Sequence, residues 1–187
     1  MALSEDTLRN TAFDLAHDSV RDVNRALQAA REGAFEVLNP NGAHALAAGL
    51  DAPVEVTIRG HAGYYAAGMN KRAAVTIEGN AGTGVAENMM SGVVRVRGDV
   101  SQSAAATAHG GLLVVEGSAS ARCGISLKGG DIVVGGSVGH MSGFMAQAGR
   151  IVVLGDAGEA LGDSLYEARV YVRGRVAGLG ADCIEKE

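Results

Sequence analysis

The sequence predicts an all-β solenoid, a stack of about seven to eight coils of nineteen residues each, with a short helical cap at its N-terminal end. The first observation is a glycine that recurs every nineteen residues without insertion or deletion, at Gly60, Gly79, Gly98, Gly117, Gly136, Gly155 and Gly174. The second is that each of these glycines closes a short apolar run, such as VTIRG or LVVEG. A period of about twenty residues is typical of stacked coils, in which each coil buries its apolar face against its neighbours.

Each apolar run predicts a short strand with one face in the core. The residues four and two positions before the repeat glycines are all aliphatic: Val56, Val75, Val94, Leu113, Ile132, Ile151 and Val170, and Ile58, Ile77, Val96, Val115, Val134, Val153 and Val172. Because strand side chains alternate between faces, both columns should point inward and the columns between them outward. One residue before the glycine, Arg59, Glu78, Arg97 and Glu116 predict a ladder of alternating charge between parallel strands.

Small residues predict where each coil turns. The second position after each glycine is Ala or Val: Ala62, Ala81, Val100, Ala119, Val138, Ala157 and Val176. The seventh is Ala or Gly: Ala67, Ala86, Ala105, Gly124, Gly143, Gly162 and Ala181. Such columns are expected where a narrow coil brings its backbone close to the axis.

The same phase extends toward the N-terminus. Three residues lie nineteen positions before members of these columns, namely Val37, Ala43 and Ala48, so we expect an imperfect eighth coil to begin near Phe35. We therefore divide the chain into an N-terminal segment, 1–34, and a β-helix domain, 35–187.

The N-terminal segment contains one expected helix. Ser19 could cap it, Val20, Val23 and Leu27 would share a face, and Gly33 would stop it. A solenoid needs its open ends covered, so a cap is favoured, with a dedicated docking arm as the alternative.

Composition and charge narrow the function classes. The formal net charge of -5 offers no basic surface for nucleic acid or an anionic membrane. No segment has the eighteen or so apolar residues of a membrane span, and Met1–Asn10 lacks the order of a signal peptide. We expect a cytoplasmic protein.

No residue pattern indicates catalysis, cofactor binding or a metal site within this chain. Cys123 and Cys183 are separated by roughly three coils, or about 14 Å at strand spacing, so they are expected to be reduced thiols. The five histidines lack metal-ligand spacing, and no serine or cysteine is accompanied by a recognisable base.

Two surfaces are candidates for recognition. Val114, Val133, Val152 and Tyr171, with Leu154 alongside, form an apolar strip on a face that should be solvated. We interpret the strip as a partner interface, although the N-terminal segment could instead fold over it. The columns eight to eleven residues after the glycine vary most, and we interpret them as a recognition edge that includes Asn88, Met89, Met90, Lys128, Phe144 and Tyr166.

The run from Glu78 to Gly98, EGNAGTGVAENMMSGVVRVRG, resembles the GXGXG-motif family. This is the right-handed parallel β-helix found as the C-terminal domain of the glutamate synthase large subunit and as a subunit of formylmethanofuran dehydrogenase. Further segments are similar to the free-standing, GlxC-type version associated with N-methylglutamate synthase: GHAGYYAAGMN from Gly60, ARCGISLKG from Ala121, GHMSGFMAQAG from Gly139, GDAGEALGDSLYEA from Gly155 and LGADC from Leu179. The resemblance runs from about Phe35 to the C-terminus.

The resemblance implies a noncatalytic subunit of a hetero-oligomer. One partner would resemble a class II glutamine amidotransferase, and the other an FMN and iron–sulfur synthase that joins an amine to 2-oxoglutarate. The assembly would be a methylamine–glutamate N-methyltransferase or a glutamate synthase-like oxidoreductase. This chain departs from the fused enzyme because Met1–Ala2 supplies no N-terminal cysteine and two cysteines are too few for a cluster. Both cofactors are therefore expected in a partner.

Two alternatives remain open at this point. The same module could serve a formylmethanofuran dehydrogenase or formyltransferase/hydrolase complex. An independent enzyme or carbohydrate-binding β-helix is disfavoured by three Phe, four Tyr and no Trp. The choice between ammonia and methylamine, and the stoichiometry, are not indicated by the sequence.

Overall fold

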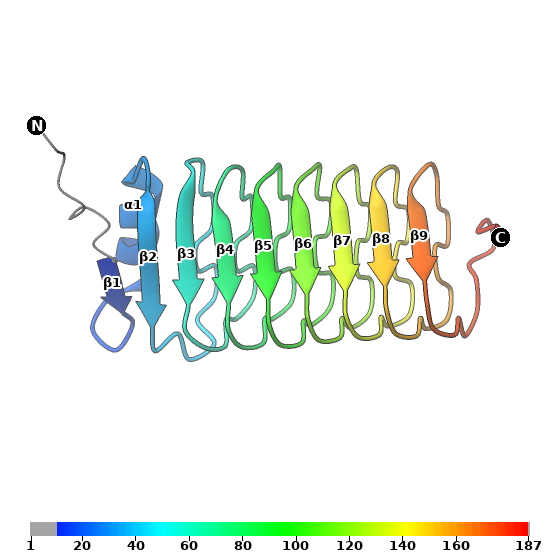
Figure 1. Cartoon of the computed structure of the whole chain (residues 1–187), viewed down its shortest axis with the longest axis horizontal. Helices are drawn as coiled ribbons and strands as arrows, with labels where there is room; N and C mark the ends of the chain where they lie inside the picture. The colour runs from blue at the N-terminus through cyan, green and yellow to red at the C-terminus, as the bar shows by residue number, and fades with distance from the viewer. Residues whose placement is uncertain (1–10, 187) are drawn as a thin grey trace, which may run out of the picture.

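The computed structural model describes residues 11–186 and contains one sheet of nine parallel strands, coiled into a right-handed solenoid (Figure 1). Met1–Asn10, on which the expectations about a signal peptide and an N-terminal cysteine rest, lies outside the described residues. The strands neighbour one another in chain order: β1 Thr11–Asp14, β2 Gly33–Leu38, β3 Val54–Ile58, β4 Ala74–Ile77, β5 Val93–Val96, β6 Leu112–Val115, β7 Asp131–Val134, β8 Arg150–Val153 and β9 Arg169–Val172. The predicted all-β parallel β-helix is confirmed.

From β3 to β9 each residue pairs with the one nineteen positions later, as Val56 with Val75 and Ile151 with Val170. The two aliphatic columns are buried in every strand from β3 to β8. In β9 they are only partly buried, because no described strand lies beyond it. The constant repeat length therefore sets both the register and the core.

A second parallel ladder runs along the solenoid through the small residues two positions after each repeat glycine, from Ala62 to Val176. Beyond it, three alternate residues of each coil adopt left-handed backbone angles, as at Tyr65, Ala67 and Met69 with φ of 58°, 53° and 55°. We call this stretch the left-handed limb. Its N–H groups bond alternately to the two flanking coils: Tyr65 N–H donates to Thr83, and Ala67 N–H donates to Leu46. The column of Ala67 contains only Ala and Gly because its positions up to Gly162 are left-handed and also buried, whereas the left-handed Tyr65 and Met69 are about half exposed.

The first coil keeps the nineteen-residue phase at Ala43, whose carbonyl accepts from Gly63 N–H as that of Ala62 accepts from Gly82 N–H, but departs from it elsewhere. Val37 pairs with Ile58, twenty-one residues away, so its expected alignment with Val56 is wrong, and Phe35 takes that place. Ala47, and not Ala48, is the buried left-handed equivalent of Ala67. The turn after β2 holds extra residues, which a search for one constant interval does not detect.

Helix α1, Val20–Ala29, begins where the sequence predicted. Ser19 caps it by accepting a hydrogen bond from Asp22 N–H, and Val23 and Leu27 are buried. The helix ends at Ala29, with Ala30 as its C-cap, rather than at Gly33, which instead begins β2.

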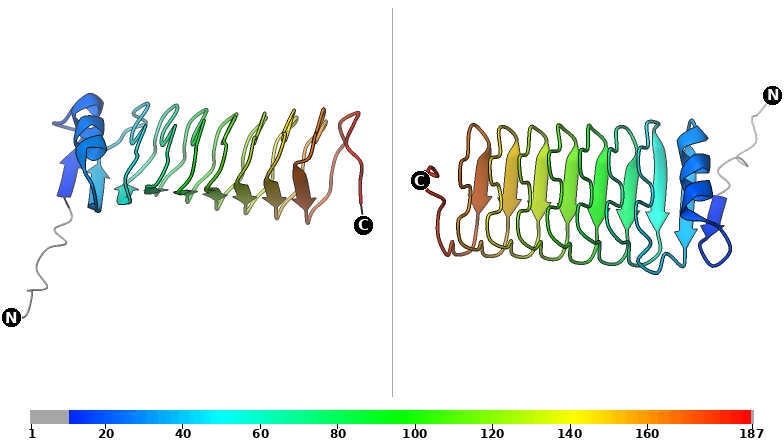
Figure 2. Two further views of the ribbon diagram at one scale, coloured as in Figure 1. Left: turned by 90° about the horizontal axis from the view of Figure 1, so that it is seen from above. Right: turned by 180° about the vertical axis from the view of Figure 1, so that it is seen from behind.

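Helix α1 covers the first coil from behind the sheet (Figure 2). Asn24 donates to Ala45 O at 2.7 Å and accepts from Ala47 N–H at 2.8 Å, while Gln28 donates to Ala48 O at 2.8 Å. These bonds satisfy backbone groups that a preceding coil would otherwise bind, which supports the favoured interpretation of the helix as a cap. Within residues 11–186, no helix is long and apolar enough to cross a membrane.

Candidate partner-binding surfaces

The outward face of the sheet carries the apolar strip, defined as Val114, Val133, Val152, Leu154 and Tyr171. Parallel pairing sets Val114, Val133, Val152 and Tyr171 side by side across β6 to β9. The three valines are half-buried, whereas Leu154 is 38% exposed and Tyr171 47% exposed. The segment from Thr11 to Glu32 lies at the β2 end of the sheet, several strands away, so no described residue of the N-terminal segment covers the strip (Figure 1).

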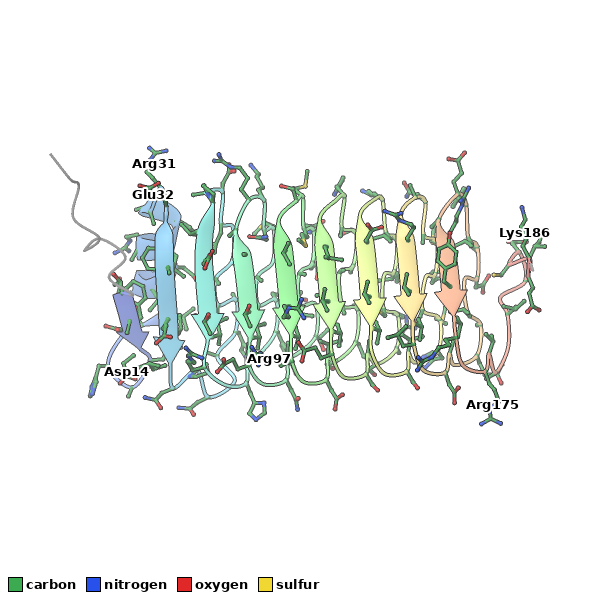
Figure 3. All side chains as sticks on the ribbon, viewed as in Figure 1. Asp14, Arg31, Glu32, Arg97, Arg175 and Lys186 are labelled. Carbon is green, nitrogen blue, oxygen red and sulfur yellow. The ribbon has the colours of Figure 1, made fainter. Side chains whose placement is uncertain are left out.

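The part of the same face toward β2 is charged instead (Figure 3). Arg59 bridges Glu36 and Glu78, and its contact with Glu78 is 2.6 Å. The hydrogen bond that Arg59 donates to the Glu36 carboxylate is the main cause that raises the pKa of the Arg59 guanidinium. Glu116 binds Arg95 at 3.0 Å. The predicted charge ladder is therefore confirmed between Arg59 and Glu78 but wrong at Glu116, because the long Arg95 side chain reaches diagonally to the next coil.

A salt bridge joins the first residues of β7 and β8, the two strands at the centre of the strip. Arg150 donates two hydrogen bonds to Asp131, at 2.7 and 2.8 Å, and this contact raises the pKa of the guanidinium. The equivalent residue in β9 is Arg169, which pairs in register with Arg150. Arg173, at the other end of β9, donates from Nε to Leu154 O at 3.0 Å. The strip is thus bordered by basic side chains at β9.

The predicted recognition edge is partly an exposed edge. Asn88, Met90, Lys128 and Tyr166 are exposed and Phe144 is half-buried. Met89 is only 1% exposed, so its assignment to this edge is wrong. Its column, ten residues after the glycine, also contains buried Asn70, Ala108, Leu127 and Ala146, whereas the next column points outward. The mostly apolar composition of that inner column is the sequence feature that could have identified Met89 as buried.

Sequence reasoning missed a polar ladder directly after the repeat glycines. In each coil the side chain accepts a hydrogen bond from the backbone N–H of its equivalent in the next coil, at 2.8–3.1 Å. The acceptors are His61, Asn80, Asp99, Ser118, Ser137 and Asp156. Every one of them has a short side chain with an acceptor atom, which is the pattern that could have revealed the ladder. His61 therefore has a structural role in joining coils.

A second exposed cluster, also missed, lies on the second coil. Tyr64, Tyr65 and Met69 are each about half exposed, and the Tyr64 ring stacks on His44 with centroids 4.6 Å apart. Tyr65 is a bulky residue in the left-handed conformation. Other coils have smaller residues at this position, such as Gly84 and Ser103. Its position in the fold could not be read from the repeat, since only the structure shows which positions are left-handed.

The described residues contain no group of three or more His, Cys, Asp or Glu side chains that could hold a metal ion. Cys123 and Cys183 are both free thiols. Complete burial raises the pKa of Cys123 to about 12, so this thiol is held in its unreactive protonated form.

The chain is thus a parallel β-solenoid that carries an apolar strip, a charged region and an exposed edge on its outer faces. No family model matches the chain. A stretch of 52 residues is 60% identical to Protein GlxC of Rhizobium meliloti (strain 1021). This match covers 26% of the chain and 23% of the length of that relative.

Proposed function

We propose that this chain is a noncatalytic scaffolding subunit of a glutamate synthase-like complex of the N-methylglutamate synthase type. It would join a class II glutamine amidotransferase-like subunit to a synthase subunit that holds FMN and an iron–sulfur cluster. The quoted family resemblance and the partial match to Protein GlxC support the type of complex. The apolar strip is the observation that carries the scaffolding role, because a contiguous exposed apolar patch usually marks an interface.

A stiff rod suits this role physically. Nine strands, the second ladder and the polar ladder join each coil to the next, so the distance between two bound partners would be held nearly constant. Fixing two active sites in register replaces free diffusion of an amine by a high effective concentration. The apolar strip lies on the strands and the exposed edge lies between them, so the two surfaces could contact different partners.

The test is copurification of the partners with a Val133→Lys variant. Val133 lies at the centre of the strip, and its side chain is half-buried on the outward face. A lysine there should abolish copurification while the circular dichroism spectrum and melting temperature stay unchanged. Thr76→Lys is the matched control, because Thr76 occupies the same outward column in β4, outside the strip. It should leave copurification intact.

Retention of the partner subunits by Val133→Lys would argue against the strip as their binding surface. The identity of the copurified proteins tests the type of complex. Amidotransferase-like and flavin-containing subunits support the proposal. Amidohydrolase-like and formyltransferase-like subunits would favour a formylmethanofuran dehydrogenase or formyltransferase/hydrolase complex instead. A flavin absorbance spectrum from the assembly, but not from this chain alone, would place FMN in a partner.

A further inference from the structure

Strand β9 leaves one edge of the sheet without a partner among residues 11–186. Arg169 N–H donates back to Gly149 O at 3.0 Å, and Arg173 N–H donates back to Val153 O at 2.9 Å. Because alternate residues of a strand direct their backbone groups to opposite sides, the N–H and C=O groups of Val170 and Val172 point away from β8. In the preceding coil the equivalent carbonyl, that of Val153, is bonded by the next strand. Unpaired edges of this kind bind additional strands.

The other end of the sheet is partly closed by its own chain, at Asp14. Asp14, the last residue of β1, donates its N–H to the Asp18 carboxylate at 2.9 Å. Its carbonyl accepts from His17 N–H at 2.9 Å and from Asp18 N–H at 2.7 Å. Figure 3 places Asp14 at the lower end of β1, where this turn folds back. The outward backbone groups at Asp14 are therefore occupied, and the two ends of the solenoid are not equivalent.

The charges along β9 indicate what its open edge would bind. Arg169 and Arg173 flank Tyr171 on the outward side, and neither has a carboxylate within 4.0 Å among the described residues. In earlier coils two arginines of the same columns pair with an acid in a neighbouring coil, Arg59 with Glu78 and Arg150 with Asp131, whereas Arg97 has no carboxylate within 4.0 Å among the described residues. Continuing these ladders by one strand places an acidic residue beside Arg169 and another beside Arg173.

A second copy of this chain is a poor occupant. An antiparallel pair of β9 strands centred on Tyr171 would set Arg169 of each copy against Arg173 of the other, and directly opposed like charges are destabilising. Head-to-tail stacking would meet the edge of β1, where Asp18 already occupies the Asp14 N–H. The opposed arginines and the occupied backbone groups of Asp14 thus disfavour self-association.

We propose that the edge of β9 binds, by parallel strand addition, an extended segment of a different protein with the pattern acidic, aliphatic, any residue, aliphatic, acidic. The two aliphatic side chains would cover Val170 and Val172, which are only partly buried. The two acidic side chains would pair with Arg169 and Arg173. This inference does not depend on the proposed function, although the apolar strip ends at Tyr171 beside the same edge.

The experiment titrates the isotope-labelled full chain with a synthetic acetylated peptide that contains Glu-Val-Ser-Val-Glu, and with a control peptide that contains Lys-Val-Ser-Val-Lys. Amide hydrogen exchange at Val170 and Val172 is followed by nuclear magnetic resonance. The acidic peptide should slow exchange at both amides and bind about tenfold more tightly than the basic one, because two opposite-charge contacts replace two like-charge contacts. The double variant Arg169→Glu, Arg173→Glu should reverse the preference.

Arg97→Glu is the matched control, because Arg97 directly follows an interior strand, β5, far from this edge. It should leave the preference for the acidic peptide unchanged. Equal binding of both peptides, or no slowing of exchange by either, would overturn the inference. So would full protection of Val170 and Val172 in the free chain, and sedimentation would then tell whether a second copy covers the edge.

Discussion

Replacement of Gly143 tests the left-handed limb most directly. Gly143 has φ of 72° and lies in the column of Ala67, Ala86 and Ala105, which hold similar angles of 51–57°. A Cβ added at Gly143 would lie 3.5 Å from Ile151 Cδ1 and 3.6 Å from a Val170 methyl group, which is ordinary contact. Space for one methyl group is therefore available, and the backbone angle is the main cost of an alanine.

The magnitudes follow from these two observations. Gly143→Ala carries the left-handed cost of about 1–2 kcal/mol, partly offset by the lower entropy of its unfolded chain, so we expect about 1 kcal/mol of destabilisation. Gly143→Val adds two methyl groups that must enter the packed space around Ile151 and Val170, which costs about 1–3 kcal/mol more. At about 2–4 °C per kcal/mol, the valine variant should melt about 5–15 °C below wild type.

Thermal and urea unfolding, followed by circular dichroism, measure both variants. The alanine variant serves as the control, because four coils already hold a left-handed alanine at this position, at Ala47, Ala67, Ala86 and Ala105. A valine variant that melts with the wild type would refute the reasoning, since it would mean that the limb adjusts its backbone at little cost. Equal losses for the two variants would show that the added methyl groups meet no packed neighbours.

Three further outcomes are expected. Ile132→Ala should lower the free energy of unfolding by about 2–5 kcal/mol, because Ile132 is buried between two coils. Val133→Ala, on the outward face, should lower it by less than about 1 kcal/mol. Equal losses in urea unfolding would contradict the alternation of faces. Asp99→Ala should cost about 0.5–1.5 kcal/mol because Ser118 N–H loses its acceptor, whereas Asp99→Asn should retain most of the stability in the same assay. Cys123, whose pKa is raised to about 12 by burial, should resist iodoacetamide at pH 8 until the chain unfolds, as mass spectrometry of the modified protein would show; rapid labelling of the folded chain would contradict its burial.

The repeat made much of the fold predictable, because a coil of constant length needs only one aligned neighbour to define its register. Val75 and Ile77 could be assigned to the core from their columns alone, and the strip around Val133 from the column between them. The polar ladder was also accessible, since every side chain from His61 to Asp156 in its column carries a short acceptor. It was missed because the column is chemically mixed, and only hydrogen-bond geometry unites it.

Other features depended on contacts that the repeat does not encode. The strand of the first coil could not be aligned, because extra residues after β2 pair Val37 with Ile58 instead of Val56. Met89 is buried because the left-handed residues before it change which side chains face inward. Backbone angles of this kind cannot be predicted from the hydrophobicity of the residues. Glu116 pairs with Arg95 because the long Arg95 side chain can reach diagonally between coils.

By itself, the sequence determined that this protein is a stack of equal coils with an aliphatic core, because each buried column needs the same residue type once every nineteen positions. The repeat does not specify how the two ends of the stack differ, which became apparent from the folded chain. That difference arises at Asp14 and at Val172, where one strand edge is bonded by its own turn and the other has no described neighbour. Closure of an edge is a property of distant backbone groups meeting in space, which no repeat interval specifies.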